Sequence, residues 1–213
     1  MKIEIWFDFI CPFCYLGERK LEMALADFRH RAETELIFKS FQLNMQAGSV
    51  MGKDINQVIA DKYHISYAQA KASNDNIIEA AREVGLNYRF DILKMNSTAL
   101  AHEITHYAGR YGKSHDLIRR YFKGYFEEGL DIGDEESLVK LAEETGIDMA
   151  EFKNLQSTGS LKSEIRSDEE AAGKAGINSI PHFIINGKYT VSGAQSPEYF
   201  LKVLNTAYED MSR

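Results

Sequence analysis

Two cysteines separated by two residues stand where a predicted strand gives way to a predicted helix. Residues 3–10 are rich in β-branched and aromatic side chains, which predicts a strand. Leucines recur at helical spacing after Cys11-Pro12-Phe13-Cys14, and Pro12 suits the first turn of a helix, where no N–H is missed. A thiol at this junction points at the unpaired N–H groups of the helix start. The helix dipole there favours its thiolate, which is the nucleophile in disulfide exchange.

Structural roles for the two thiols are less consistent with this pattern. Cys11 and Cys14 are the only cysteines, and a disulfide between them would close a loop of two residues, which stabilises a fold little. A zinc site needs two more ligands, and no second cysteine pair supplies them. We therefore interpret Cys11 as the attacking thiol and Cys14 as the resolving thiol of a redox-active centre.

Composition and charge narrow the classes of partner. The chain has 213 residues, a net charge of −7 and no block of lysine and arginine, so we expect neither nucleic acid nor an anionic membrane as a partner. No apolar run approaches the length of a membrane span. Glu4 and Asp8 interrupt the first apolar run, which argues against a signal peptide. We expect a cytoplasmic protein, where such a cysteine pair is more often catalytic or redox-sensing than structural.

Strands are predicted near both ends of the chain and helices in the middle. Residues 35–41 alternate as a second strand, and residues 54–155 are almost entirely helical in pattern. Asn186-Gly187 lies between the predicted strands 182–185 and 188–192 and indicates a hairpin. The predicted helix starts and ends are Ser66 to Val84, Ser97 or Thr98 to Gly109, 115–128, 134–145, and a last helix opened by Ser196 and Pro197.

Taken together, these segments resemble the thioredoxin fold and, within it, the DsbA family, most of all its cytoplasmic FrnE-type branch. The resemblance covers nearly the whole chain and is carried by residues 8–17, 41–44, 98–102, 177–183 and 193–195. It implies an α/β thioredoxin fold with a large all-helical insertion. The thioredoxin-like domain would be discontinuous, formed by residues 1–45 and 160–213, and residues 46–159 would form the helical insertion.

The resemblance also implies site residues and an activity. Pro181 matches the family's cis-proline, which faces the dithiol, so that Ile180 can pair with an incoming peptide strand; the alternative is an ordinary proline at a strand edge. His102 would face the dithiol cleft, where it would shuttle protons or tune the thiolate. The other implied substrate-binding residues are Pro12, Phe13, Tyr15 and His182.

The implied activity is that of a protein disulfide oxidoreductase or isomerase that needs no cofactor. Its partners would be protein or small-molecule thiols and disulfides, with glutathione or thioredoxin as the electron partner. Phe13 stands where DsbA has histidine, which suggests an intermediate redox potential. The net direction of the reaction, the substrate and the choice between monomer and homodimer stay open.

Two other activities compete with this prediction. Kappa-class glutathione transferases and 2-hydroxychromene-2-carboxylate isomerases share the fold, but they typically have serine at the first thiol position. Here the dithiol is intact, and residues 193–196 offer no charge for a γ-glutamyl group. His102-Glu103-Ile104-Thr105-His106 matches the H-E-x-x-H motif of zinc proteases, but Gly112 occupies the position of the third ligand. We therefore predict no metal site.

Overall fold

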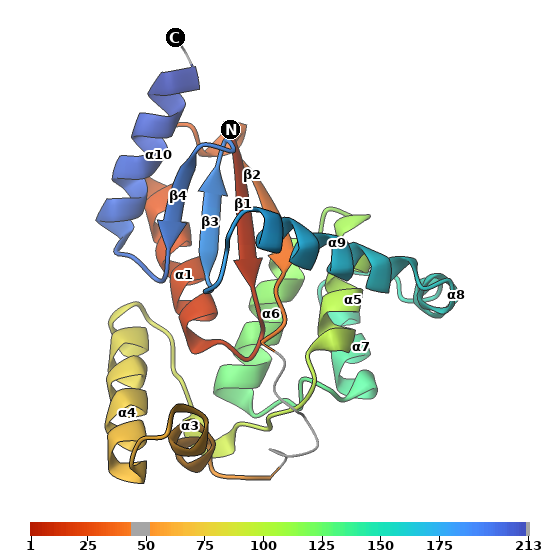
Figure 1. Cartoon of the computed structure of the whole chain (residues 1–213). Helices are drawn as coiled ribbons and strands as arrows, with labels where there is room; N and C mark the ends of the chain where they lie inside the picture. Colours follow the sequence, from red (N-terminus) through yellow and green to blue (C-terminus); the bar gives the residue numbers. More distant parts are fainter. Residues whose placement is uncertain (44–51, 212–213) are drawn as a thin grey trace. The chain divides into compact units, whose positions relative to one another are not determined.

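Contacts within the chain divide it into two compact units. The computed structural model describes residues 1–43 and 52–211 (Figure 1). The first unit contains residues 1–42 and 162–213, and the second contains residues 43–161. The two ends of the chain therefore fold together, and the middle forms a unit of its own.

A four-stranded sheet forms the centre of the first unit. The strands β1 (Lys2–Phe7), β2 (Glu35–Ser40), β3 (His182–Ile185) and β4 (Tyr189–Ser192) lie in the order β2-β1-β3-β4. The β1–β2 pair is parallel, and the β1–β3 and β3–β4 pairs are antiparallel. Asn186 and Gly187 both have positive φ, as the predicted hairpin turn requires. This mixed sheet confirms the predicted α/β class.

The predicted first strand is too long at its end. Strand β1 stops at Phe7, and the chain then turns. The Asp8 carboxylate accepts a hydrogen bond from Phe9 N at 2.8 Å, and Asp8 O accepts one from Cys11 N at 3.2 Å. An acidic side chain that bonds the local backbone ends the strand, although the apolar pattern continues to Ile10.

Helices cover both faces of the sheet (Figure 1). Helices α1 (Pro12–Asp27) and α10 (Pro197–Met211) pack on one face, with a core that includes Ile3, Ile5, Leu21, Leu25, Phe183, Phe200 and Leu204. Helix α9 (Ser160–Lys174) contributes to a smaller cluster of Trp6, Ala172 and Ile177 on the other face. Successive side chains of β1 point to opposite faces, so Ile5 and Trp6 enter different clusters.

Helix α9 is tied to the sheet by one buried carboxylate. Asp168 is 5 % exposed. Its Oδ1 lies 3.0 Å from Lys39 Nζ, and its Oδ2 accepts a hydrogen bond from Ser40 N at 3.0 Å. Its backbone oxygen accepts one from Trp6 Nε1 at 3.1 Å. One residue of α9 therefore bonds both parallel strands.

The second unit is built of helices. They are α3 (Ile55–Tyr63), α4 (Tyr67–Glu83), α5 (Ala99–Gly109), α6 (Ser114–Glu128), α7 (Glu135–Glu144) and α8 (Phe152–Ser157). Helix α5 packs against α6, α7 and α8, and α3 pairs with α4. The core of the unit is rich in buried rings, among them Tyr121, Phe122, Tyr125 and Phe126. The tyrosine and phenylalanine residues of α6 therefore serve packing.

The ends of several helices follow the sequence signals. Ser66 forms a capping box with Gln69 at the start of α4, and Asp134 accepts a hydrogen bond from Ser137 N at the start of α7. Ser196 Oγ accepts a hydrogen bond from Tyr199 N at 3.3 Å at the start of α10. Within residues 1–43 and 52–211, none of the helices combines the length and the apolar character that crossing a bilayer requires.

Candidate active site

The cysteine pair lies at the start of α1, directly after the turn that ends β1. Cys11 is the N-cap residue and Pro12 is the first helical residue. Both thiols are free and buried, Cys11 with 6 % and Cys14 with 2 % of its surface exposed. The Cys11 side chain makes no capping hydrogen bond within the described residues, so its orientation toward the N–H groups of the helix start stays a prediction. Its Sγ instead lies 3.9 Å from Ile180 O.

Burial distinguishes the second thiol chemically. Burial raises the pKa of the Cys14 thiol well above its usual value, and the neighbouring Cys11 raises it further. The fully buried Asp8 carboxylate also raises this pKa through its charge, while the Asp8 backbone lowers it through a hydrogen bond. Cys14 is therefore held as a neutral thiol near pH 7. Asp8 was missed as a site residue, although a charged residue within an apolar run was a usable signal.

The loop before β3 brings a proline to the dithiol helix. The Ile180–Pro181 peptide bond is cis, as predicted. Pro181 is buried, and its carbonyl oxygen accepts a hydrogen bond from Gly193 N at 2.8 Å. The following His182 is half-buried, and desolvation lowers the pKa of its imidazole. The loop is therefore fixed on one side by the sheet and lies beside Cys11 on the other.

The remaining predicted site residues occupy distinct environments. Phe13 is 46 % exposed at the start of α1, whereas Tyr15 is buried on the same helix. Pro12 and Ile180 are half-buried. His102 lies in α5 of the second unit and is 0 % exposed. Its role toward the dithiol stays a prediction.

The H-E-x-x-H motif lies on α5, as predicted. Glu103 is buried, and its Oε2 has no hydrogen-bond partner among the described residues. Over the same residues, no group of three or more histidine, cysteine, aspartate or glutamate side chains is arranged to hold a metal ion. That the protein binds no zinc stays a prediction, which elemental analysis of the purified protein would test.

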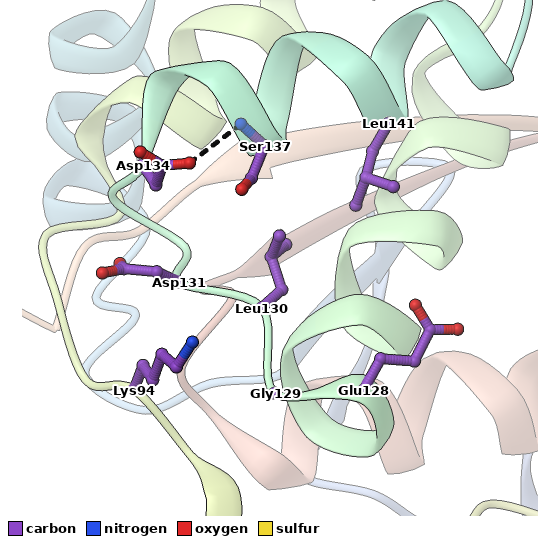
Figure 2. Close-up of a pocket in the computed structure, with 8 residues that line it drawn as sticks. All are labelled: Lys94, Glu128, Gly129, Leu130, Asp131, Asp134, Ser137 and Leu141. Atoms are coloured by element: carbon purple, nitrogen blue, oxygen red, sulfur yellow. Dashed lines mark hydrogen bonds between the residues drawn. The ribbon is translucent and has the colours of Figure 1, made fainter.

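A separate cavity of about 450 Å³ opens in the second unit (Figure 2). Its lining consists of Lys94, Gly129, Leu130 and Leu141 together with four polar residues, Glu128, Asp131, Asp134 and Ser137. Among these four, Asp134 accepts a hydrogen bond from Ser137 N at 2.9 Å, and Asp131 accepts one from Gly133 N at 2.9 Å. Glu128 pairs with Arg120 at 2.8 Å. These three carboxylates already bind neighbouring residues of the second unit. The cavity contains none of the predicted site residues.

Comparison with known proteins agrees with this arrangement. The model of the DSBA-like thioredoxin domain matches residues 2–205. A probable DsbA oxidoreductase of Streptomyces coelicolor is 33 % identical, with a TM-score of 0.90 over 98 % of this chain and 90 % of that one.

Two further solved structures are similar in fold. The cytosolic disulfide reductase DsbM of Pseudomonas aeruginosa, solved with GSH, is 15 % identical, with a TM-score of 0.69 over 98 % of this chain and 100 % of that one. A 2-hydroxychromene-2-carboxylate isomerase is 16 % identical, with a TM-score of 0.68 over 100 % of this chain and 97 % of that one. The match of the domain model over nearly the whole chain decides the family: this protein belongs to the DsbA-like thioredoxin-domain oxidoreductases.

Proposed function

We propose that the protein exchanges disulfides with protein or peptide substrates through the Cys11–Cys14 dithiol. One observation carries this proposal: Cys11 Sγ lies 3.9 Å from Ile180 O, at the start of α1 and beside the cis Ile180–Pro181 bond. The nucleophile and a backbone edge able to hold a peptide therefore lie in one place. Substrate sulfur bound along that edge would lie within reach of Cys11.

The chemistry divides into two exchange steps. The Cys11 thiolate attacks one sulfur of the substrate disulfide, so that a mixed disulfide forms and the other substrate sulfur leaves and takes up a proton. Cys14 then loses its proton and attacks Cys11 Sγ. This step closes the Cys11–Cys14 disulfide and releases the second substrate thiol. Two electrons have moved from the protein to the substrate, and the reverse sequence oxidises a dithiol substrate.

The difference between the two thiols supports this order. Because burial raises the pKa of Cys14, that residue stays protonated while Cys11 attacks. Cys14 is less exposed than Cys11, so an incoming substrate meets Cys11 first. Cys14 has to lose its proton only when the mixed disulfide is resolved.

Residues around the dithiol would position the substrate. Ile180 would pair with the substrate backbone, and Pro181 would present a ring, with no N–H, to the sulfurs. Phe13 offers an exposed aromatic face next to Cys14, while Pro12, Tyr15 and His182 complete the surroundings. The proton-shuttling role of His102 stays a prediction from the resemblance. No cofactor takes part in these steps.

Glutathione is a suitable electron partner for this centre in the cytoplasm. Two glutathione molecules would reduce the Cys11–Cys14 disulfide, one forming a mixed disulfide and the second releasing oxidised glutathione. The DsbM structure was solved with GSH, which supports glutathione over thioredoxin as the partner. The similarity in fold to the isomerase favours, as a second candidate, a glutathione-dependent transferase or isomerase activity.

Trapping of the mixed disulfide tests the proposal. Cys14→Ser removes the resolving thiol, so it should accumulate mixed disulfides with cellular proteins, visible on non-reducing gels. Cys11→Ser, the matched control, removes the nucleophile and should accumulate none. Mass spectrometry of the trapped species separates the candidates. A glutathione adduct as the only product would favour the transferase or isomerase, and equal trapping by both variants would refute the assigned roles.

A further inference from the structure

A glycine occupies the interior of the helix that carries the dithiol. Gly17 lies in the second turn of α1 and is buried. Glycine within a helix costs about 1 kcal/mol relative to alanine, because the unfolded chain loses more conformational freedom. Alanine would therefore be the better residue here on helix propensity alone, and the glycine needs a reason in the packing.

The packing supplies that reason on the side of the proline loop. A Cβ added to Gly17 would lie 2.9 Å from Pro181 Cγ, 3.4 Å from Phe183 Cζ and 3.5 Å from Ala194 Cα. These three residues come from the cis-proline loop, from β3 and from the segment between β4 and α10. Gly17 is therefore a position where the dithiol helix lies against all three segments.

The neighbours of Gly17 cannot give way easily. Pro181 Cγ is a ring atom, and the same residue is fixed by the hydrogen bond from Gly193 N to Pro181 O at 2.8 Å. Phe183 is 0 % exposed and packs edge-to-face on Phe200, with ring centroids 4.8 Å apart. Of the three contacts, only the one to Pro181 Cγ is too short for a methyl group. A methyl group at Gly17 would therefore push α1 and the Pro181 loop apart, because tightly packed interiors adapt poorly to added volume.

We propose that Gly17 is a positioning residue that sets the spacing between the dithiol and the substrate-binding edge. Cys11 caps the same helix, and Ile180 directly precedes Pro181. Separating α1 from Pro181 therefore separates Cys11 Sγ from Ile180 O, now 3.9 Å apart. Lys20, one turn further along α1, adds a second contact between this helix and the segment before α10, since its Nζ donates a hydrogen bond to Ala194 O at 3.2 Å. This inference rests on the proposed disulfide exchange and names what aligns it.

Gly17→Ala tests the proposal, with Gly173→Ala as the matched control. Gly173 lies in α9, and no atom of the described residues comes within 4 Å of a Cβ built there. We expect Gly17→Ala to reduce the rate with a disulfide-containing peptide about tenfold or more, since a shift of about 1 Å can cost ~100-fold. Alkylation of Cys11 by iodoacetamide does not use the Ile180 edge and should change less than about twofold. Gly173→Ala should match wild type in both assays.

Other outcomes would overturn the proposal. Peptide turnover by Gly17→Ala at the wild-type rate, or an equal loss in turnover and in alkylation, would show that Gly17 does not position the edge. Should Gly17→Ala fail to fold, Lys20→Met decides, because it removes the hydrogen bond to Ala194 O and, beyond that, only a charge near the exposed Glu198. We expect it to slow peptide turnover and leave alkylation unchanged, and an unaffected rate would refute the inference. A wild-type protein inactive on the peptide would instead refute the proposed function.

Discussion

Replacement of Asp168 by alanine should destabilise the first unit more than any single surface charge could. The substitution leaves Ser40 N, in a residue that is 2 % exposed, without its acceptor at 3.0 Å. The loss of a buried hydrogen bond to a charged acceptor costs about 1–3 kcal/mol. Lys39 also loses its partner at 3.0 Å, although Glu4 remains at 4.0 Å, so this loss adds about 1 kcal/mol at a site with partial solvent access. The expected loss in the free energy of unfolding is about 2–4 kcal/mol.

Urea unfolding followed by tryptophan fluorescence measures this loss at the right place. Trp6 is the only tryptophan, and its Nε1 donates to the backbone oxygen of Asp168. A loss of this size corresponds to a melting temperature lower by about 5–15 °C for a chain of this length. Asp168→Asn keeps an acceptor for Ser40 N and should fall between wild type and Asp168→Ala.

The control for the Asp168 variants is a substitution in a solvent-exposed ion pair, Lys71–Asp75. Asp75 Oδ2 lies 2.6 Å from Lys71 Nζ, and both side chains are more than half exposed. Solvent screens such a pair, so Asp75→Ala should leave the unfolding midpoint unchanged within error. An Asp168→Ala variant that is as stable as Asp75→Ala would refute the reasoning that this carboxylate holds α9 to the sheet.

Three further outcomes are expected. Iodoacetamide should modify Cys11 well before Cys14 in the reduced protein at pH 7, because burial raises the pKa of Cys14; peptide mapping would show it, and equal rates would contradict it. The reduced protein should lose stability as pH rises through about 9, because the unfolded chain then releases the Cys14 proton while the folded protein retains it. Cys14→Ser should weaken that dependence. Tyr121→Phe should cost about 1–2 kcal/mol by leaving Leu138 O without the Tyr121 hydroxyl, and chemical unfolding would measure it.

The local signals in the sequence predicted most of the elements. Ser66 and Asp134 cap the helices that they were expected to open, and Asn186-Gly187 forms the expected turn. These features depend on residues close together in the chain, where propensity and side-chain hydrogen bonds decide. The end of β1 was not predicted, because an apolar run cannot show that the Asp8 side chain will bond Phe9 N.

The candidate site was predictable in its chemistry and less so in its geometry. The cysteine pair and Pro181 follow from short motifs, and the cis bond before Pro181 was expected from the resemblance. The contact of Cys11 with Ile180 O, and the pKa of Cys14, depend on which segments meet in space. Sequence separation between Cys11 and Ile180 is 169 residues, so no local pattern reports this contact.

Gly17 shows why the geometry of such a site escapes local rules. Helix propensity disfavours glycine there by about 1 kcal/mol, so propensity alone predicts that Gly17 weakens α1. The same residue lets the Pro181 ring approach the helix more closely than any side chain would allow. A local cost that persists in a tightly packed region indicates that the close approach has a use. Here the approach places Ile180 beside Cys11, where the proposed disulfide exchange would hold the substrate backbone.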